Sequence, residues 1–172
     1  MIKMLSPREL DANLSTFVEL LQESVDGGGA LGFHAPLAAD EAREYWRALR
    51  SEIETGSRVL LAASENGRIV GSGQLALAPW RNARHRASIE KVFVSAALRG
   101  RGIAKALINA LQDSARLRGR SLLLINARQG GAAEQLYKRL GYREFGVIPG
   151  YAMGPGGERW DSVCMYRELS LS

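Results

Sequence analysis

The sequence predicts an α/β (α+β) domain in which a mixed sheet carries helices on both faces. Strand-like and helix-like segments alternate along the 172 residues, and neither a linker nor an internal repeat divides them. The clearest local signal is the segment 89–111, where an apolar run, a glycine turn and an amphipathic helix follow one another. We therefore expect one domain, residues 1–172, organised around this strand, turn and helix.

A first strand and a long helix are predicted at the start of the chain. Residues 2–5 are the candidate strand. Ser6–Glu9 begins a helix, because it combines a serine cap, a proline at the first helical position and a glutamate three residues after the cap. Apolar residues at three- and four-residue steps continue to Leu21, which predicts one helix that ends at the glycines 27–29.

The three consecutive glycines open a loop that runs to Pro36 and allows two interpretations. It is either a flexible linker or a backbone that bends closely around a substrate. If it binds substrate, two further loops are expected to contribute contacts as well. The candidate substrate residues are Asp26, Phe33, His34, Trp80 and Tyr151.

A second helix and a hairpin are predicted next. Apolar residues between Ala42 and Ile53 have helical spacing, and Gly56 is the expected C-terminal cap. The dipeptide Asn66–Gly67 is a strong hairpin signal between the apolar runs 59–63 and 69–78. We expect two antiparallel strands joined by this turn.

The central strand and the helix after it enclose a candidate anion site. Residues 89–94 are mostly apolar and β-branched, and from Ile103 the apolar spacing becomes helical. Between them lies Arg99–Gly102, with two arginines and two glycines at the start of the helix. Helix N-termini carry unpaired N–H groups and partial positive charge, so this turn suits an anion such as a pyrophosphate. The alternative is an ordinary turn with solvated arginines.

The second half of the chain predicts a further strand, a helix and two final strands. Residues 122–125 form a continuous apolar run, which is typical of a strand covered on both faces. The remaining expected elements are a helix that carries Tyr137 and ends at Gly141, an extended segment 142–148, loops at 149–150 and 153–157, and a last strand 160–169.

Two motifs in this order resemble the GNAT acetyltransferase superfamily. The spacing Arg99-x-x-Gly102-x-Ala104 after a strand is similar to its acetyl-CoA signature, and Ala133–Tyr142 is similar to its tyrosine-bearing helix. The resemblance implies a single-domain GNAT fold with a mixed, mostly antiparallel sheet of about seven strands. It also implies transfer of acetyl from acetyl-CoA directly to a primary amine, without a metal.

Loops on both sides of the chain also look like those of the tabtoxin-resistance-type acetyltransferases, which modify small amino-acid-like toxins. The segments concerned are 23–33 and 149–151. The resemblance implies a small-molecule acceptor such as an amino-acid-like toxin or antibiotic. A non-catalytic acyl-CoA-binding sensor on the same fold is the alternative, favoured if Glu90 is buried in a salt bridge. A homodimer is one option for the assembly.

The resemblance assigns acetyl-CoA contacts and a catalytic acid, and the central strand offers a base. Tyr137 stands where the family has its acid, although its helical spacing with Leu136 and Leu140 also fits a core aromatic. Strand alternation predicts that Ser88, Glu90, Val92 and Val94 share one face, which would direct Glu90 to the reacting centre. The expected cofactor contacts are Val92, Phe93, Val94, Arg99, Gly100, Arg101, Gly102, Ile103, Ala104, Asn126 and Tyr137.

The identity of the base stays open. The subgroup has carboxylates where this chain has Ser88 and Asn126, and neither of these side chains is a useful base. Deprotonation of the amine would then fall to Glu90, to an ordered water, or to a loop residue such as Asp26 or His34.

Composition and charge argue against several other functions. The net charge is +5, but Arg and Lys are spread along the chain, so we expect no nucleic-acid partner. No apolar run reaches spanning length and no signal-peptide pattern opens the chain, which predicts a cytoplasmic protein. His34 and His85 lack ligand spacing, so no metal is expected. The single Cys164 is expected to be a buried thiol.

Overall fold

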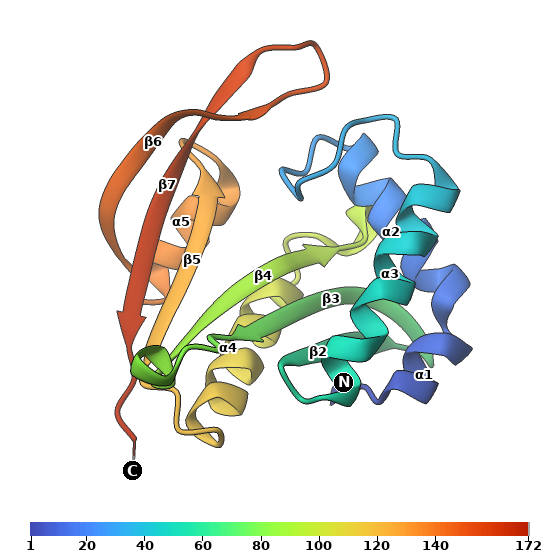
Figure 1. Ribbon diagram of the computed structural model, residues 1–172. Coiled ribbons are helices and arrows are strands. Elements are labelled where there is room, and N and C mark those ends of the chain that lie inside the picture. Colours follow the sequence, from blue (N-terminus) through green and yellow to red (C-terminus); the bar gives the residue numbers. More distant parts are fainter. Residues whose placement is uncertain (172) are drawn as a thin grey trace.

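Residues 1–171, which the computed structural model describes, contain one seven-stranded sheet with the order β1-β2-β3-β4-β5-β7-β6 (Figure 1). Only β4 and β5 are parallel, and all other neighbours are antiparallel. The predicted mixed and mostly antiparallel sheet is therefore confirmed. The strands are β1 (Ile2–Met4), β2 (Arg58–Glu65), β3 (Arg68–Leu77), β4 (Arg86–Val94), β5 (Leu122–Arg128), β6 (Arg143–Met153) and β7 (Arg159–Glu168).

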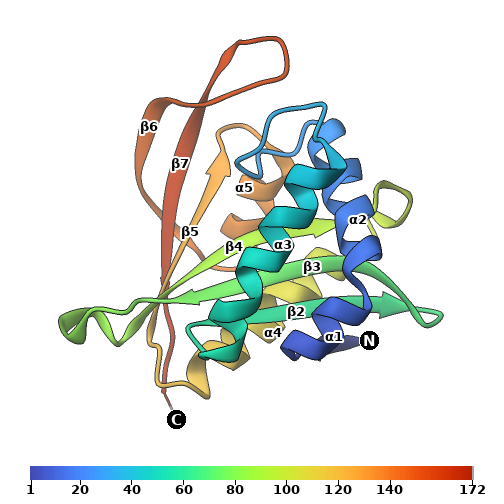
Figure 2. The same cartoon turned by 45° about the vertical axis from the view of Figure 1, so that its right-hand side comes forward.

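Helices cover both faces of the sheet, as predicted (Figures 1 and 2). One face carries α1 (Pro7–Ala12), α2 (Leu14–Asp26) and α3 (Ala39–Glu54), and the other carries α4 (Ile103–Arg116) and α5 (Ala132–Arg139). Short 3₁₀ turns precede and follow β4, at 81–83 and 96–98.

Each helical layer has its own hydrophobic core. Leu107 and Leu111 of α4 are fully buried with Leu75 and Leu123 of the sheet. On the opposite face, Trp46 of α3 is fully buried, and its indole N–H donates to the carbonyl of Phe17 at 3.1 Å. Fully burying a large apolar side chain stabilises a fold by roughly 1.5–3 kcal/mol, so both layers hold the sheet firmly.

The single N-terminal helix predicted up to residue 26 is wrong, because the chain breaks it at Asn13. The predicted start is correct: the Ser6 hydroxyl accepts the N–H of Glu9, whose carboxylate accepts the N–H of Ser6. Asn13 then leaves helical geometry, with φ −115° and ψ 16°, and its side-chain amide donates to the Glu9 carbonyl at 2.8 Å. An asparagine amide competes for backbone groups in this way and ends α1.

The hairpin at Asn66–Gly67 is confirmed, with positive φ values of 50° and 77°. The loop predicted at 149–150 is not a separate loop, because β6 continues to Met153. Its pairing with β7 is irregular between Ile148 and Ala152. Pro149 lacks an N–H, and the Gly150 N–H donates to the Asp161 carboxylate at 2.8 Å instead of to the ladder.

A β-bulge interrupts β4 and changes which side chains share a face. Gln74 of β3 pairs with Glu90 and Ser72 pairs with Phe93, so Lys91 and Val92 together oppose one residue. Lys91 has a φ of 50°. Beyond the bulge Val92 packs towards α4, whereas Glu90 lies on the α3 side. The prediction that Ser88, Glu90, Val92 and Val94 share one face is therefore wrong.

The two parallel strands are paired only where they begin. Residues 86–88 of β4 pair with 122–124 of β5, and beyond this point the strands diverge (Figure 1). The rest of β5 remains paired to β7. The sheet therefore opens in its centre, at the carboxyl ends of β4 and β5.

Candidate active site

A cavity of about 750 Å³ occupies the opening between β4 and β5. Its walls are the bulged end of β4, the glycine loop (residues 27–36), the start of α4, the end of β5 and the inner face of α5. We refer to it as the larger cavity. It contains most of the predicted cofactor contacts, namely Val92, Phe93, Val94, Arg99, Gly100, Gly102, Ile103, Ala104, Asn126 and Tyr137.

One end of the larger cavity suits an anion. Gly102 is the N-cap of α4 with φ 81°, and it provides no side-chain cap for the N–H groups of the first turn. These donors and the positive end of the helix dipole therefore face the cavity. Lys105, which was not among the predicted contacts, also lines the cavity. Arg101 does not, because its guanidinium pairs with Glu65 at 2.9 Å.

Lys91, at the bulge, fastens the glycine loop to the sheet. Its ammonium donates to the Leu31 carbonyl and lies 5.3 Å from the ring centroid of Phe33 and 5.8 Å from that of Tyr45. Burial lowers the pKa of Lys91. The loop is also closed at its base, where the Asp26 carboxylate accepts the N–H of Leu37 at 2.9 Å. The glycine loop is thus built into the site and is not a free linker.

Glu90 reaches the larger cavity, but its carboxylate is already paired. Arg58 donates to it at 2.7 Å and to Glu52 at 2.8 Å. The Glu90 side chain keeps 41% of its surface exposed, whereas that of Arg58 keeps 14%. Glu90 is therefore a partly exposed carboxylate held by a largely buried guanidinium.

Tyr137 projects from α5 into the same cavity. Only 6% of the residue is exposed. Burial, with a smaller effect of the neighbouring Tyr142, raises the pKa of the Tyr137 phenol above its usual value. At neutral pH the phenol is therefore protonated and can donate a hydrogen bond. It also packs in the core against Tyr142, with ring centroids 6.0 Å apart, as the interpretation of a core aromatic predicted.

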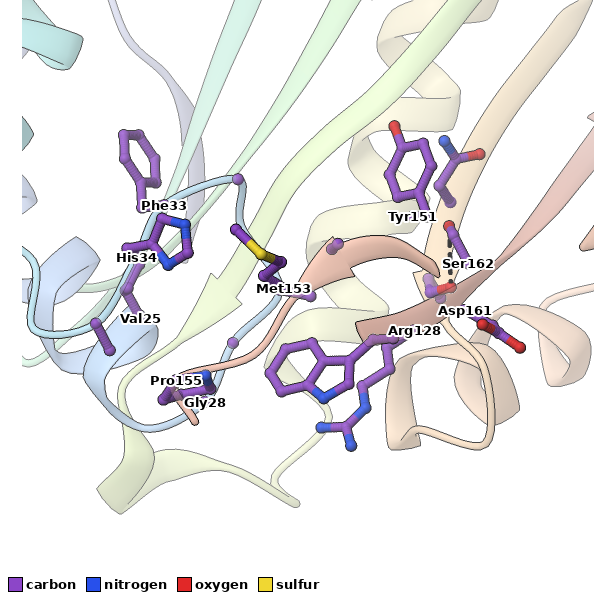
Figure 3. A pocket seen from close by; sticks show the side chains of 18 of the residues that line it. Val25, Gly28, Phe33, His34, Arg128, Tyr151, Met153, Pro155, Asp161 and Ser162 are labelled. Atoms are coloured by element: carbon purple, nitrogen blue, oxygen red, sulfur yellow. Dashed lines mark hydrogen bonds between the residues drawn. The ribbon is translucent and has the colours of Figure 1, made fainter. Parts of the chain in front are cut away.

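A smaller cavity of about 460 Å³ adjoins the larger one (Figure 3). Its walls are the glycine loop, the end of β5, the irregular part of β6 and the start of β7. Three of the predicted substrate residues, Phe33, His34 and Tyr151, line this cavity. The other two predicted substrate residues, Asp26 and Trp80, line neither cavity. Asp26 closes the glycine loop, and Trp80 lies in the segment before β4, where 67% of it is exposed.

Two side chains of the smaller cavity, Arg128 and Trp160, were not predicted to be site residues. The Arg128 guanidinium lies 3.8 Å from the ring centroid of Trp160. Arg128 and Asn126 alternate on one face at the end of β5, and both line both cavities. This alternation of polar residues after an apolar run was a usable signal for Arg128, but the partner Trp160 comes from a distant strand.

Residues 28–142 match the family described as acetyltransferase (GNAT) family. This match covers more than half of the chain, which therefore belongs to the GNAT acetyltransferases. It is an N-acetyltransferase that uses acetyl-CoA. An uncharacterized N-acetyltransferase from the hisH-hisA intergenic region of Azospirillum brasilense is 29% identical over 120 residues, covering 68% of this chain and 69% of the relative.

Two solved structures show the same fold at low sequence identity. The ribosomal-protein-alanine N-acetyltransferase of Brucella melitensis has a TM-score of 0.79 and 21% identity, with 98% of this chain and 99% of that chain covered. A Salmonella typhimurium protein solved with its cofactor acetyl-CoA has a TM-score of 0.78 and 20% identity, with 99% and 94% covered. Within residues 1–171, no helix is long and apolar enough to cross a membrane.

Proposed function

We propose that the protein transfers acetyl from acetyl-CoA directly to the primary amine of a small molecule held in the smaller cavity. The observation that supports this most strongly is the shared wall between the two cavities. Asn126 to Arg128 and Gly28 to Ala30 line both of them. A thioester in the larger cavity and an amine in the smaller one can therefore meet at this wall without an acyl-enzyme.

The size of the smaller cavity favours a small acceptor. Its volume of about 460 Å³ falls within the roughly 300–1,000 Å³ typical of small-molecule sites. Its lining combines apolar surfaces such as Phe33 and Met153 with a few polar groups such as His34 and Asn126. An amino-acid-like molecule fits this mixture. The alternative acceptor is a protein N-terminus, which the name of the Brucella relative suggests.

The larger cavity has the features that acetyl-CoA requires. Uncapped N–H groups at the start of α4 suit its pyrophosphate, and the open edge of β4 at residues 92–94 suits the amide-bearing pantetheine arm. Acetyl-CoA supplies the activated acyl group. The chain's own part is to hold the thioester beside the acceptor and to move two protons.

We assign the proton for the departing thiolate to Tyr137. The phenol lies in the larger cavity on the inner face of α5, and its raised pKa keeps it protonated. A thiol has a pKa of about 8.5 and an ordinary phenol about 10, so transfer depends on close contact in the transition state. Because burial raises the pKa of Tyr137, full transfer of its proton to the thiolate becomes harder. Tyr137 then contributes to catalysis mainly by donating a hydrogen bond to the sulfur.

We assign the removal of the amine's proton to Glu90, acting directly or through a water. An alkylammonium has a pKa of roughly 10, so little of the amine is free at neutral pH. Glu90 lines the larger cavity and remains partly exposed. Its ion pair with Arg58 at 2.7 Å holds it in place.

The sensor alternative depended on Glu90 being buried in a salt bridge. The salt bridge to Arg58 exists, but the side chain is 41% exposed and lines the cavity. Only half of that condition is met, and the relatives are named as N-acetyltransferases. We therefore favour the enzyme.

A screen of small amines with thiol detection of released CoA tests the proposal. Each amine is compared with a reaction that lacks it, which corrects for hydrolysis of the thioester. We expect at least one small primary amine to release CoA and to gain an acetyl group by mass spectrometry. Acetylation of a peptide N-terminus with no reaction of any small amine would contradict the proposal.

A further inference from the structure

The Arg128 guanidinium is held in place but has no anionic partner in the part of the chain that the structure describes. No hydrogen bond or ion pair joins its side chain to another residue there. Arg99 and Arg139, which line the larger cavity, likewise have no carboxylate partner among the described residues, although Arg99 donates to the Val94 carbonyl at 3.3 Å. Two arginines that line neither cavity are paired with carboxylates. Arg58 donates to Glu90 and Glu52, and Arg101 pairs with Glu65.

Stacking on Trp160 leaves the guanidinium N–H groups of Arg128 available as hydrogen-bond donors. The guanidinium lies 3.8 Å from the indole centroid, a contact that orients a planar cation without using its N–H groups. The indole is itself fixed, because Trp160 is 9% exposed and its N–H donates to Glu158 at 3.1 Å. A fixed fork of free N–H donors is the group that recognises a carboxylate through two parallel hydrogen bonds.

No carboxylate of the described residues lies within ion-pair distance of Arg128, and the Glu158 carboxylate beside Trp160 accepts the indole N–H. Asp161 is the only acidic residue among those that line the smaller cavity, and its side chain accepts the Gly150 N–H. Figure 3 shows it directed away from Arg128. Ser162, which pairs with Arg128 across the strands, donates its hydroxyl to the Ala127 carbonyl at 3.3 Å. Arg128 therefore brings to the cavity wall a positive charge that no carboxylate within ion-pair distance offsets.

The position of Arg128 favours contact of its guanidinium with the acceptor and not with the nucleotide part of acetyl-CoA. The anion-binding end of the larger cavity lies at the start of α4, whereas Arg128 stacks on Trp160 of β7, in the wall that the two cavities share. We infer that the acceptor amine carries a carboxylate, and that Arg128 binds this carboxylate while the amine faces the thioester. The inference rests on the proposed function, because it names the class of small amine that the smaller cavity takes.

The test compares amino acids with their carboxamides, which keep the amine and lose the negative charge. L-leucine, β-alanine and γ-aminobutyrate, each with its amide, sample three separations between amine and carboxylate. Hydrogen bonds to a charged group are worth roughly tenfold to a hundredfold in binding. We expect the parent to prefer at least one amino acid over its amide by this factor in kcat/KM. Arg128→Gln should lose the preference by raising the KM of the acceptor, with the KM of acetyl-CoA within about twofold.

Arg47→Gln, which removes an exposed arginine of α3, is the matched control and should keep the preference. A binding measurement separates this inference from the proposed function. Isocaproate, which is leucine without its amine, should bind by calorimetry to the CoA-saturated parent and not to Arg128→Gln, even if no small amine is acetylated. Equal rates for every amino acid and its amide, or isocaproate binding unchanged by Arg128→Gln, would overturn the inference.

Discussion

The two ends of the β4–β5 pair are built from different kinds of residue. Where the strands are paired, Ala87 and Leu123 are buried in the core against α4. Where they separate, the bulge at Lys91 and the exposed Asn126 and Arg128 replace this apolar contact. The paired end provides stability, and the separated end provides room for two substrates.

This difference shows how a parallel pair can be opened without loss of the sheet. Each separated strand keeps its other neighbour: β4 stays with β3, and β5 stays with β7 as far as Arg128. The backbone edges that face the opening are thereby left for ligands, while the outer edges remain hydrogen-bonded. Substitutions at the two ends should therefore separate stability from binding.

The largest expected effect on stability comes from the paired end. Leu123→Ala removes a fully buried side chain from the core, and such changes cost roughly 2–5 kcal/mol of unfolding free energy. Urea unfolding measures this loss, and repeating it with acetyl-CoA measures the stabilisation by the ligand. We expect that stabilisation to be unchanged in Leu123→Ala and reduced in Asn126→Ala, from the other end of the same strand. The reverse pattern would refute the division between the two ends.

The largest expected effect on turnover comes from the acid. Tyr137→Phe keeps the packing of the ring and removes the hydroxyl, and general acid catalysis is worth on the order of a hundredfold or more. We expect kcat to fall by that factor with the affinity for acetyl-CoA nearly unchanged. Tyr142→Phe, on the neighbouring buried ring, is the control. A kcat within a fewfold of the parent would make Tyr137 a purely structural residue.

An intermediate effect is expected at the anion end of the larger cavity. Gly102 has φ 81°, so Gly102→Val strains the backbone by roughly 1–3 kcal/mol and also blocks the close approach of the pyrophosphate. We expect CoA affinity to fall about tenfold or more by calorimetry. Gly119→Val imposes a similar strain at the other end of α4, where φ is 66°, and should leave CoA affinity intact. Equal affinity in both variants would remove the α4 N-terminus from the site.

The smallest effect is expected at Glu90, where water can take over part of the role. Glu90→Gln should lower turnover at neutral pH and recover partly as pH rises, because free amine accumulates towards its pKa of roughly 10. Glu52→Gln disturbs the same Arg58 without reaching the cavity. Its pH–rate profile should follow the parent. Parallel profiles for Glu90→Gln and the parent would leave deprotonation to solvent or to another group such as His34.

Much of the fold could be predicted because its signals are local. The Ser6–Glu9 helix start, the Asn66–Gly67 turn and the Arg99–Gly102 turn each lie within a few residues. The break at Asn13 and the bulge at Lys91 were missed, because apolar spacing continues through both and the pairing partner decides the register.

The candidate site was less predictable, because it depends on contacts between distant segments. The sequence indicated Gly102, Tyr137 and the glycine loop. It could not show that Arg101 turns to Glu65, nor that Arg128 meets Trp160. Both facts follow from side chains that the sheet brings together across 36 and 32 positions of the chain.

The central claim is that two adjoining cavities bind acetyl-CoA and the amine at the same time, and initial-rate kinetics with both substrates varied test it most directly. The acceptor is any amine that the screen identifies. Direct transfer in a ternary complex predicts double-reciprocal lines that intersect, and an enzyme that stays unacetylated when mixed with acetyl-CoA alone. Parallel lines, together with an acetylated enzyme that passes its acetyl group to the amine, would contradict the account.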